Sequence, residues 1–290
     1  MIILHTIKET RDFLAKQRKS GKSIGLVPTM GALHQGHISL TNKSVTENDL
    51  TISSIYVNPV QFNNPEDFKN YPIMLESDAQ MLEAAGCNAI FAPSHEEMYP
   101  NGFENLFTSM EFDSLSSTLE GEQRPGHFSG VGVVVSKLFN IVAPNRAYFG
   151  QKDMQQLAII SQMNTDLSFG IEIVRCPTVR EKDGLAMSSR NRRLNPKERA
   201  AAPTLYQSML KACEHIANGG DVIEAKEIGK KQILEEKLFG LEYFEFVHTD
   251  SLEKLKEKIT LDKMAICLAA QLGSARLIDN FWLKDYLIRK

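Results

Sequence analysis

The sequence predicts an α/β protein with a doubly wound, Rossmann-like parallel sheet in an N-terminal domain, residues 1–177, and a smaller α+β C-terminal domain, residues 178–290. Two observations predict this division. Short apolar runs alternate with longer segments of helical spacing through the first 180 residues. A polar, arginine-rich segment, 180–193, then leads into two helical patterns and a cluster of strand patterns. The second part is a plausible size for a domain of its own.

Five segments of the N-terminal part are typical of strands, each bounded by Gly, Pro or Asn: Ser23–Val27, Thr51–Val57, Asn88–Phe91, Ala147–Phe149 and Ile171–Cys176. Five others have the length and apolar spacing of helices: Ile7–Arg18, Ile38–Asn48, Met74–Ala85, Val131–Ile141 and Met154–Leu167. Strands separated by helix-length segments cannot pair as hairpins, so right-handed crossovers onto a parallel sheet are expected. Ligands should then bind at the carboxyl ends of the strands.

The C-terminal part begins with a clear helix start. Asn195 is the expected N-cap, Pro196 takes the first helical position and Glu198 completes a capping box. Gly219-Gly220-Asp221 should end that helix and begin another, which we expect to end near Gly240. Three strands are predicted beyond it, at Tyr243–Val247, Ala265–Ala270 and Leu277–Trp282.

Composition excludes several classes of protein. The 290 residues are 42% hydrophobic and 24% charged with a net charge of -3, and residues 191–290 carry 17 basic and 15 acidic side chains (+2). Neither part of the chain is a basic arm of the kind that binds nucleic acid. Four cysteines without C-x-x-C spacing fit a reducing cytoplasm, not a zinc module or a disulfide scaffold. The longest apolar stretch, Met264–Ala275, is shorter than the ~20 residues of a membrane span, and no signal peptide is apparent. We expect a soluble, cytoplasmic protein.

The strongest functional signal follows the first predicted strand, where Thr29 to His37 read T-x-G-x-x-H-x-G-H before a helical run. A strand, a glycine-bearing turn and a helix start form an anion site, because unpaired N–H groups and the helix dipole converge there. His34 and His37 can add donors to phosphate oxygens. The alternative is that both histidines are surface residues of a loop.

This motif resembles that of the nucleotidylyltransferase superfamily, whose members attack the α-phosphate of a nucleotide and release pyrophosphate. Further segments narrow the resemblance: Tyr56–Phe62, Arg124–Val131, Phe149–Gln156 and Met187–Asn191. In this order and spacing the five motifs resemble the pantothenate synthetase (pantoate–β-alanine ligase) family over essentially the whole chain. One departure is Gln151, where the family often has Glu; we expect little consequence.

The resemblance implies ATP-dependent ligation of pantoate and β-alanine through a pantoyl adenylate, with Mg²⁺ accompanying ATP, and a homodimer formed through the N-terminal domain. It implies catalytic roles for His34, His37, Lys152 and Arg190, and a C-terminal domain that closes over the ATP site. The implied ATP-binding residues are Met30, Gly31, Ala32, Leu33, His34, Gln35, Gly36, His37, Gly150, Gln151, Lys152, Asp153, Val179, Met187, Ser188, Ser189 and Arg190. It places Gln61 and Gln156 on pantoate, and Asn58 and Arg124 in the same substrate-binding set.

Each segment also has an interpretation of its own. Asn58 and Gln61 follow a strand, where amides can bond a small polar substrate, although an Asn-Pro turn alone is usually just a turn. Arg124 sits in a glycine-rich stretch that can be a loop that reorganises over a ligand, with Arg124 bonding a carboxylate, or a plain surface turn. Lys152, at a strand end, can reach triphosphate oxygens or simply be solvated. The loop 187–190 resembles the superfamily's KMSKS-type loop, with Arg190 in place of a lysine; alone, it would be a flexible linker.

Asp78, in a predicted helix, is the candidate protein ligand for Mg²⁺; an exposed helix carboxylate is its alternative. Three rival functions stay open. An aminoacyl-tRNA synthetase-like module shares the histidine and serine motifs but should carry a basic stripe. A plain nucleotidylyltransferase would stop after transferring AMP, and a nucleotide sensor would bind ATP without releasing pyrophosphate.

Overall fold

The computed structural model describes residues 1–106 and 108–288. By its internal contacts the chain divides into two units. Unit 1 comprises Met1–Gly150 and Gln156–Pro177, and unit 2 comprises Gln151–Gln155 and Thr178–Lys290. The short segment Gln151–Gln155 therefore groups with the C-terminal residues although it directly follows a strand of the first sheet.

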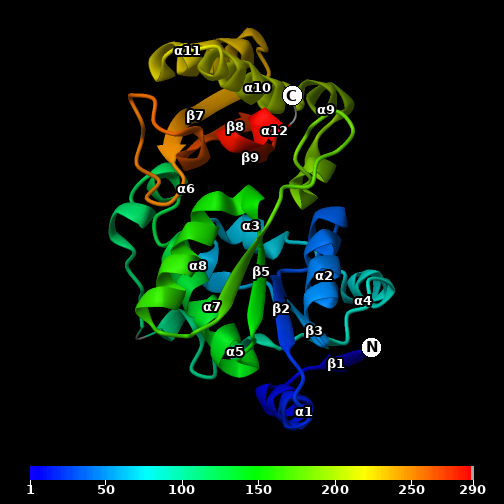
Figure 1. Ribbon diagram of the computed structural model, residues 1–290. Helices are drawn as coiled ribbons and strands as arrows, with labels where there is room; N and C mark the ends of the chain where they lie inside the picture. The colour runs from blue at the N-terminus through cyan, green and yellow to red at the C-terminus, as the bar shows by residue number, and fades with distance from the viewer. Residues whose placement is uncertain (107, 289–290) are drawn as a thin grey trace. The chain divides into compact units, whose positions relative to one another are not determined.

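Unit 1 is built on a six-stranded sheet in the order β1-β4-β3-β2-β5-β6, with every pair parallel. The strands are β1 (Ile2–Leu4), β2 (Ile24–Thr29), β3 (Leu50–Ile55), β4 (Ala89–Phe91), β5 (Arg146–Gly150) and β6 (Glu172–Cys176). Figure 1 shows α2 and α4 on one face of this sheet and α7 and α8 on the other. The predicted doubly wound, Rossmann-like fold is confirmed.

The helices of the first 177 residues are α1 (Ile7–Lys19), α2 (Gln35–Glu47), α3 (Pro65–Lys69), α4 (Leu75–Ala84), α5 (His95–Met98), α6 (Leu119–Gln123), α7 (His127–Val142) and α8 (Met154–Asp166). Apolar strand residues such as Leu26, Ile52 and Phe91 are fully buried, as is Phe139 of α7. Because both faces of a doubly wound sheet are covered, its strands are apolar without alternation.

Unit 2 contains an antiparallel sheet, β7-β8-β9, made of β7 (Phe239–His248), β8 (Met264–Leu272) and β9 (Ala275–Trp282). Its helices are α9 (Pro196–Ala201), α10 (Thr204–Ala217), α11 (Val222–Glu235) and α12 (Leu283–Ile288). In Figure 1, α10 and α11 lie together on one side of this sheet. Phe244, Phe246 and Leu268 of the sheet and Met209 and Ile216 of α10 form its core. The predicted α+β architecture is confirmed.

The structure differs from the prediction in several elements. Strand β1 was not expected, because three residues are too few to show a period. The helix predicted from Pro196 is two helices, α9 and α10, with Pro203 between them. The helix predicted to end near Gly240 ends at Glu235, and Gly240 lies in β7. Helices α2 and α7 begin with polar turns, three or four residues before their apolar patterns.

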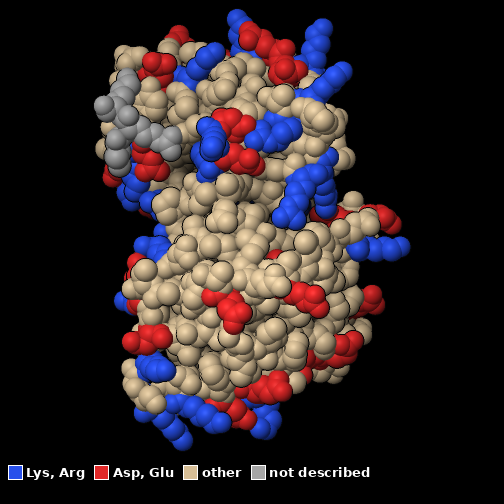
Figure 2. Space-filling view, turned by 90° about the vertical axis from the view of Figure 1, so that its right-hand side faces the viewer, with Lys and Arg blue, Asp and Glu red and all other residues tan. Residues whose placement is uncertain are grey.

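Three observations bear on the function classes considered from the sequence. On the face shown in Figure 2, Lys and Arg side chains are interspersed with Asp and Glu. Within residues 1–106 and 108–288, no helix has the length and apolar character needed to cross a bilayer. All four cysteines are buried.

A close backbone contact joins α7 to the turn that follows β3. Gly130 of α7 packs against η1 (Pro59–Gln61), a single 3-10 turn. A Cβ atom added at Gly130 would lie 2.7 Å from the carbonyl carbon and oxygen of Val60 and 2.8 Å from the Gln61 nitrogen. All three are backbone atoms, so they cannot rotate away. The helix therefore needs glycine here.

We expect Gly130→Ala to lower the free energy of unfolding by about 1–3 kcal/mol, because the methyl group overpacks a backbone contact. In an exposed helix interior the same change would stabilise the protein by ~0.5–1 kcal/mol. The sign of the change in the free energy of unfolding therefore distinguishes a close backbone contact from an open position. Urea unfolding measures it, with Gly150→Ala as the control, since no atom lies within 4 Å of a Cβ added there. A Gly130→Ala variant at least as stable as the parent would contradict the contact.

Candidate active site

The loop after β2 holds an unusual backbone. Gly31 has φ of +80° and the next residue, Ala32, has φ of +51°. Thr29 begins the turn: its hydroxyl donates to the Ser54 carbonyl oxygen (2.7 Å) and accepts from the Gly31 N–H (3.2 Å). Consecutive left-handed residues turn their N–H groups to one side, which forms a cradle for an anion.

The anion in that cradle is the carboxylate of Asp78. This α4 residue is 1% exposed, and its two oxygens accept from the N–H groups of Ala32 (2.9 Å) and Leu33 (2.8 Å). The alternative interpretation from the sequence, that Asp78 is an exposed helix carboxylate, is therefore wrong. Asp78 also fits poorly as a Mg²⁺ ligand, because both oxygens already orient the loop. Among the residues that the structure describes, no group of three or more His, Cys, Asp or Glu side chains is arranged to hold a metal.

The two histidines of the motif form a capping box at the start of α2. His34 is the N-cap and its Nδ1 accepts from the Gly36 N–H (3.1 Å), while His37 Nδ1 accepts from the His34 N–H (3.3 Å). The rings lie 4.1 Å apart and are half-buried. Since each Nδ1 is an acceptor, the neutral rings carry their protons on Nε2. Both histidines therefore present Nε2–H donors at a helix N-terminus.

A cavity of about 290 Å³ lies at the carboxyl ends of β2, β3 and β4. It is lined by Met30 and Gly31 after β2, by Tyr56 and Val57 after β3, and by residues 92–96 after β4, with Ile73–Leu75 beside them. Its place agrees with the sheet edge where the topology predicts ligands.

Gln61 and Asn58 are both buried at this edge. The Asn58 amide nitrogen donates to Gln61 Oε1 and to the Gly130 carbonyl oxygen, each at 3.1 Å, and Tyr99 donates to Asn58 Oδ1 at 2.7 Å. Burial raises the pKa of Tyr99, so its hydroxyl stays a donor. Asn58 thus contacts other protein groups through both ends of its amide.

Arg124 and His127 hold the backbone of Gln61. His127 Nδ1 lies 2.8 Å from the Gln61 carbonyl oxygen, and Arg124 Nη1 lies 3.1 Å from His127 Nε2. An arginine can only donate, so His127 Nε2 accepts and its Nδ1–H donates to Gln61. His127 is the first residue of α7, the helix that also carries Gly130.

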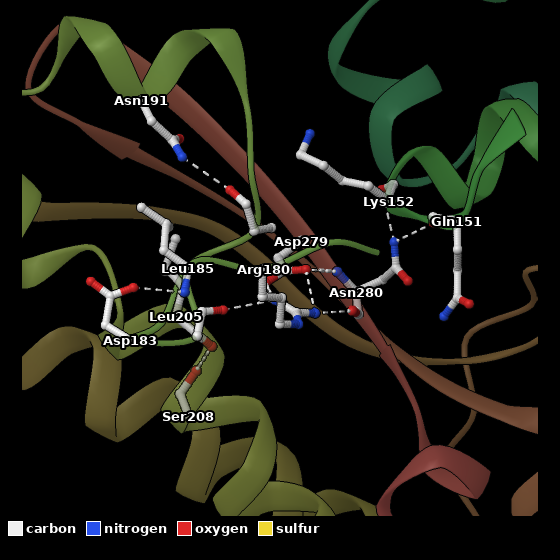
Figure 3. A network of polar contacts seen from close by, with 12 residues as sticks. Gln151, Lys152, Arg180, Asp183, Leu185, Asn191, Leu205, Ser208, Asp279 and Asn280 are labelled. Carbon is white, nitrogen blue, oxygen red and sulfur yellow. Dashed lines mark hydrogen bonds and ion pairs between the residues drawn. The ribbon is translucent and has the colours of Figure 1, made fainter. Parts of the chain in front are cut away.

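In unit 2, the turn Gln151–Asp153 is fixed by Asn280 of β9. The Asn280 amide nitrogen donates to the carbonyl oxygens of Gln151 (2.9 Å) and Lys152 (2.8 Å), and Figure 3 shows it pointing at this turn. Beside it, Arg180 pairs with Asp279 (2.6 Å) and donates to the Asn280 carbonyl oxygen (3.1 Å). The position of Lys152 therefore depends on β9, far along the chain.

The serine- and arginine-containing loop lies in the same unit. The Met187 N–H donates to the Val179 carbonyl oxygen (3.0 Å), and Ser188 caps η5 (Ser189–Arg193) by accepting from the Arg190 N–H (3.3 Å). Lys152, Ser188 and Arg190 line one narrow pocket with Asp279. Three of the predicted phosphate-binding side chains are thus brought together in unit 2.

The remaining predicted residues are distributed as follows. Residues 30–37, Asn58, Gln61 and Arg124 lie in unit 1, with Gly150 at the end of β5 and the half-buried Gln156 in the first turn of α8. Residues 151–153, Val179 and 187–190 lie in unit 2. The predicted site residues therefore fall into two groups, one in each unit, and each group has its own internal supports.

Comparison with known proteins identifies the family. The family model for pantoate-beta-alanine ligase matches residues 2–282. Proteins named pantothenate synthetase from Caldicellulosiruptor bescii and Cytophaga hutchinsonii are 49% and 46% identical to this chain over 281 residues, covering 97% of it and 98% of each relative. The chain belongs to the pantoate–β-alanine ligase family. The expectation of an ATP-dependent ligase is confirmed.

Solved structures agree with the sequence relatives. The crystal structure of pantothenate synthetase from Thermus thermophilus superposes with a TM-score of 0.91 at 42% identity, covering 98% of this chain and 99% of that one. A pantoate-beta-alanine ligase from Francisella tularensis, complexed with beta-gamma ATP and beta-alanine, gives a TM-score of 0.79 at 37% identity, with 98% of each chain covered.

Four supporting residues were missed from the sequence or given another role: Asp78, Tyr99, His127 and Asn280. Each acts on a site residue at least 40 positions away, for example Asp78 on Leu33 and Asn280 on Lys152. His127 stands in a motif quoted above, and a histidine at the start of an apolar helix was its one local signal. The others lack any local signal.

We expect Asp78→Ala to lower the free energy of unfolding by about 2 kcal/mol or more, because two buried N–H groups lose their acceptors. ATP-dependent activity should fall as well, since the loop before His34 loses its support. Urea unfolding and an activity assay measure the two effects. Glu76→Ala removes an exposed carboxylate from the same helix and should change neither. If the two variants behave alike, Asp78 does not hold the loop.

Proposed function

We propose that this chain joins pantoate to β-alanine in two steps, using ATP and releasing AMP and pyrophosphate. One observation carries the proposal: a chain that matches the pantoate–β-alanine ligase family from residue 2 to 282 has two Nε2–H histidine donors at a helix N-terminus directly after the central strand β2. Such a terminus favours negative charge.

In the first step, a pantoate carboxylate oxygen attacks the α-phosphorus of ATP. The bond from that phosphorus to the bridging oxygen breaks, and pyrophosphate leaves with its electron pair. In the second step, the β-alanine nitrogen attacks the acyl carbon of pantoyl adenylate, AMP leaves, and the amine loses a proton. A carboxylate cannot expel oxide, so adenylation supplies the leaving group. No covalent bond to the protein is required.

The protein stabilises charge and aligns the reactants. We assign His34, His37, Lys152 and Arg190 to the phosphates of the first transition state, where donors fixed in place cost no reorganisation. Ser188 and Ser189 supply hydroxyl donors, and residues 30–37, 150–153, Val179 and Met187 complete the ATP site. Gln61 and Gln156 bind pantoate. Asn58 and Arg124 act on Gln61 and its backbone, in accordance with their contacts.

Four further assignments rest on the family resemblance. Mg²⁺ enters the site with the ATP phosphates, as part of the substrate, and Asp78 is not one of its ligands. The domains are residues 1–177 and 178–290, and the second closes over the ATP site. The protein is a homodimer through its N-terminal domain. It acts in the cytoplasm, which suits four buried cysteines.

The test is an incubation of the purified protein with ATP, Mg²⁺, pantoate and β-alanine, followed by product analysis. We expect AMP, pyrophosphate and pantothenate in equal amounts. Labelled pyrophosphate should also exchange into ATP when pantoate is present and β-alanine is absent. Pyrophosphate without an amide would indicate a nucleotidylyltransferase, and exchange that requires β-alanine would indicate a concerted reaction.

We expect His34→Asn to slow pyrophosphate exchange by about 10²–10³-fold, because one preorganised donor is lost. Asparagine is a preferred N-cap, so the helix start keeps its hydrogen bond while the side chain no longer reaches as far as Nε2. His37→Ala should have a similar effect on the rate. Exchange kinetics at saturating ATP measure both, and thermal unfolding checks the fold. Parental activity in either variant would refute that histidine's role.

Arg190→Ala should raise the ATP concentration needed for half-maximal exchange by about tenfold, because phosphate oxygens lose a charged donor. The pantoate requirement should change far less. Arg192→Ala is the matched control, since Arg192 is an exposed arginine in the same 3-10 turn and does not line the pocket. Equal effects of the two variants would mean that only overall charge matters.

A further inference from the structure

Three buried polar side chains form a chain of hydrogen bonds behind the proposed pantoate site. Tyr99 is 3% exposed, Asn58 is 1% exposed and Gln61 is 8% exposed. The Tyr99 hydroxyl donates to Asn58 Oδ1 (2.7 Å), and Asn58 Nδ2 donates to Gln61 Oε1 (3.1 Å). Tyr99 directly follows α5, so it reaches Asn58 from another part of unit 1.

The direction of this chain is fixed by a backbone group. Asn58 Nδ2 also lies 3.1 Å from the carbonyl oxygen of Gly130, which can only accept. The amide of Asn58 must therefore turn its nitrogen toward Gly130 and its oxygen toward Tyr99. Gly130 is in reach because the absence of a side chain lets α7 touch η1.

Asn58 sets the orientation of the Gln61 side-chain amide. One Asn58 N–H points at Gly130 and the other points at Gln61, so Gln61 must accept this hydrogen bond with its side-chain oxygen. The Gln61 nitrogen is left to face the other way, where Met30 Sδ lies 3.4 Å from it. A thioether sulfur is a weak acceptor, so a ligand oxygen is the better partner. Gln61 thus meets a ligand with N–H donors only.

We propose that Tyr99 is a positioning residue for pantoate recognition, acting through Asn58 to hold the Gln61 amide with its nitrogen toward the substrate. This inference rests on the proposed function, in which Gln61 binds pantoate. The substrate group selected in this way is one that offers oxygen lone pairs, a carboxylate or a hydroxyl. Tyr99 itself touches no substrate.

A merely structural role for the Tyr99 hydroxyl is the competing explanation, and Tyr148 of β5 offers a matched control. Tyr148 is fully buried, and its hydroxyl lies 2.7 Å from Asn48 Nδ2 and 2.9 Å from Glu47 Oε2, at the end of α2. Tyr148→Phe therefore removes a similarly buried hydroxyl from unit 1 but leaves the chain to Gln61 intact. Both Phe variants should have similar thermal unfolding midpoints.

The first experiment measures the pantoate concentration for half-maximal pyrophosphate exchange in both Phe variants. We expect Tyr99→Phe to raise this concentration about tenfold, because buried Asn58 Oδ1 loses its donor. The ATP concentration for half-maximal exchange should stay within about twofold of the parent. Tyr148→Phe should change neither value. Equal pantoate effects in the two variants would overturn the proposal.

A double-mutant cycle tests the route through Asn58. In an Asn58→Ala background, Tyr99→Phe should add nothing to the pantoate requirement, because the residue through which it acts is gone. Additive effects would overturn the proposal even if Tyr99→Phe alone behaved as expected. Asn58→Asp gives a check that does not depend on Tyr99 variants. A carboxylate cannot donate to Gln61, so the pantoate requirement should rise at least tenfold, and a parental value would contradict the assigned direction.

Gln61→Ala separates failure of this inference from failure of the proposed function. If Gln61→Ala raises the pantoate requirement and Tyr99→Phe does not, Gln61 binds pantoate and Tyr99 does not position it. If Gln61→Ala leaves the requirement unchanged, the placement of Gln61 in the proposed function is wrong and the inference falls with it.

Discussion

The close approach of Gly130 to the turn Pro59–Gln61 is the constraint on which the substrate side of the site depends. It exists because α7 has no side chain at this position, and it brings a carbonyl oxygen of the helix within 3.1 Å of the Asn58 amide. Buried polar groups need partners, so this acceptor and the Tyr99 hydroxyl together set the orientation of Asn58 and then of Gln61. The same helix contributes His127, which holds the Gln61 backbone.

Other parts of the site follow the same physical rule. Asp78 accepts from two N–H groups of a strained loop, and Asn280 holds the turn of Lys152. At the start of α2, His34 accepts from the Gly36 N–H and His37 accepts from the His34 N–H. In each case a polar side chain fixes a segment of backbone, and at the start of α2 the two histidine rings then carry Nε2–H donors. Donors arranged before the substrate arrives need no reorganisation during the reaction, which is the main way that a protein stabilises developing charge.

The sequence predicted what short-range pattern encodes. Apolar runs identified β2 to β6 within a few residues, and the Asn195 capping box was confirmed. Strand β1 was too short for a period, and Gly240 was interpreted as a helix end although it pairs in β7. The motif residues stood out locally, whereas Asp78, Tyr99 and Asn280 act across long sequence separations. One sequence does not record which distant residue will supply a buried partner, and the fold is needed to name it.

The orientation of the Gln61 amide decides how the substrate side of the site binds pantoate: Gln61 should meet pantoate through its amide nitrogen. The most direct measurement is the side-chain amide NMR signal of Gln61 in protein labelled with ¹⁵N-glutamine, assigned by its disappearance in Gln61→Ala and followed as pantoate is added. We expect both amide proton resonances to move on pantoate binding, since a ligand oxygen replaces a weak sulfur acceptor. Resonances that stay in place at saturating pantoate would contradict it, because Gln61 would then face the substrate with its oxygen or not at all.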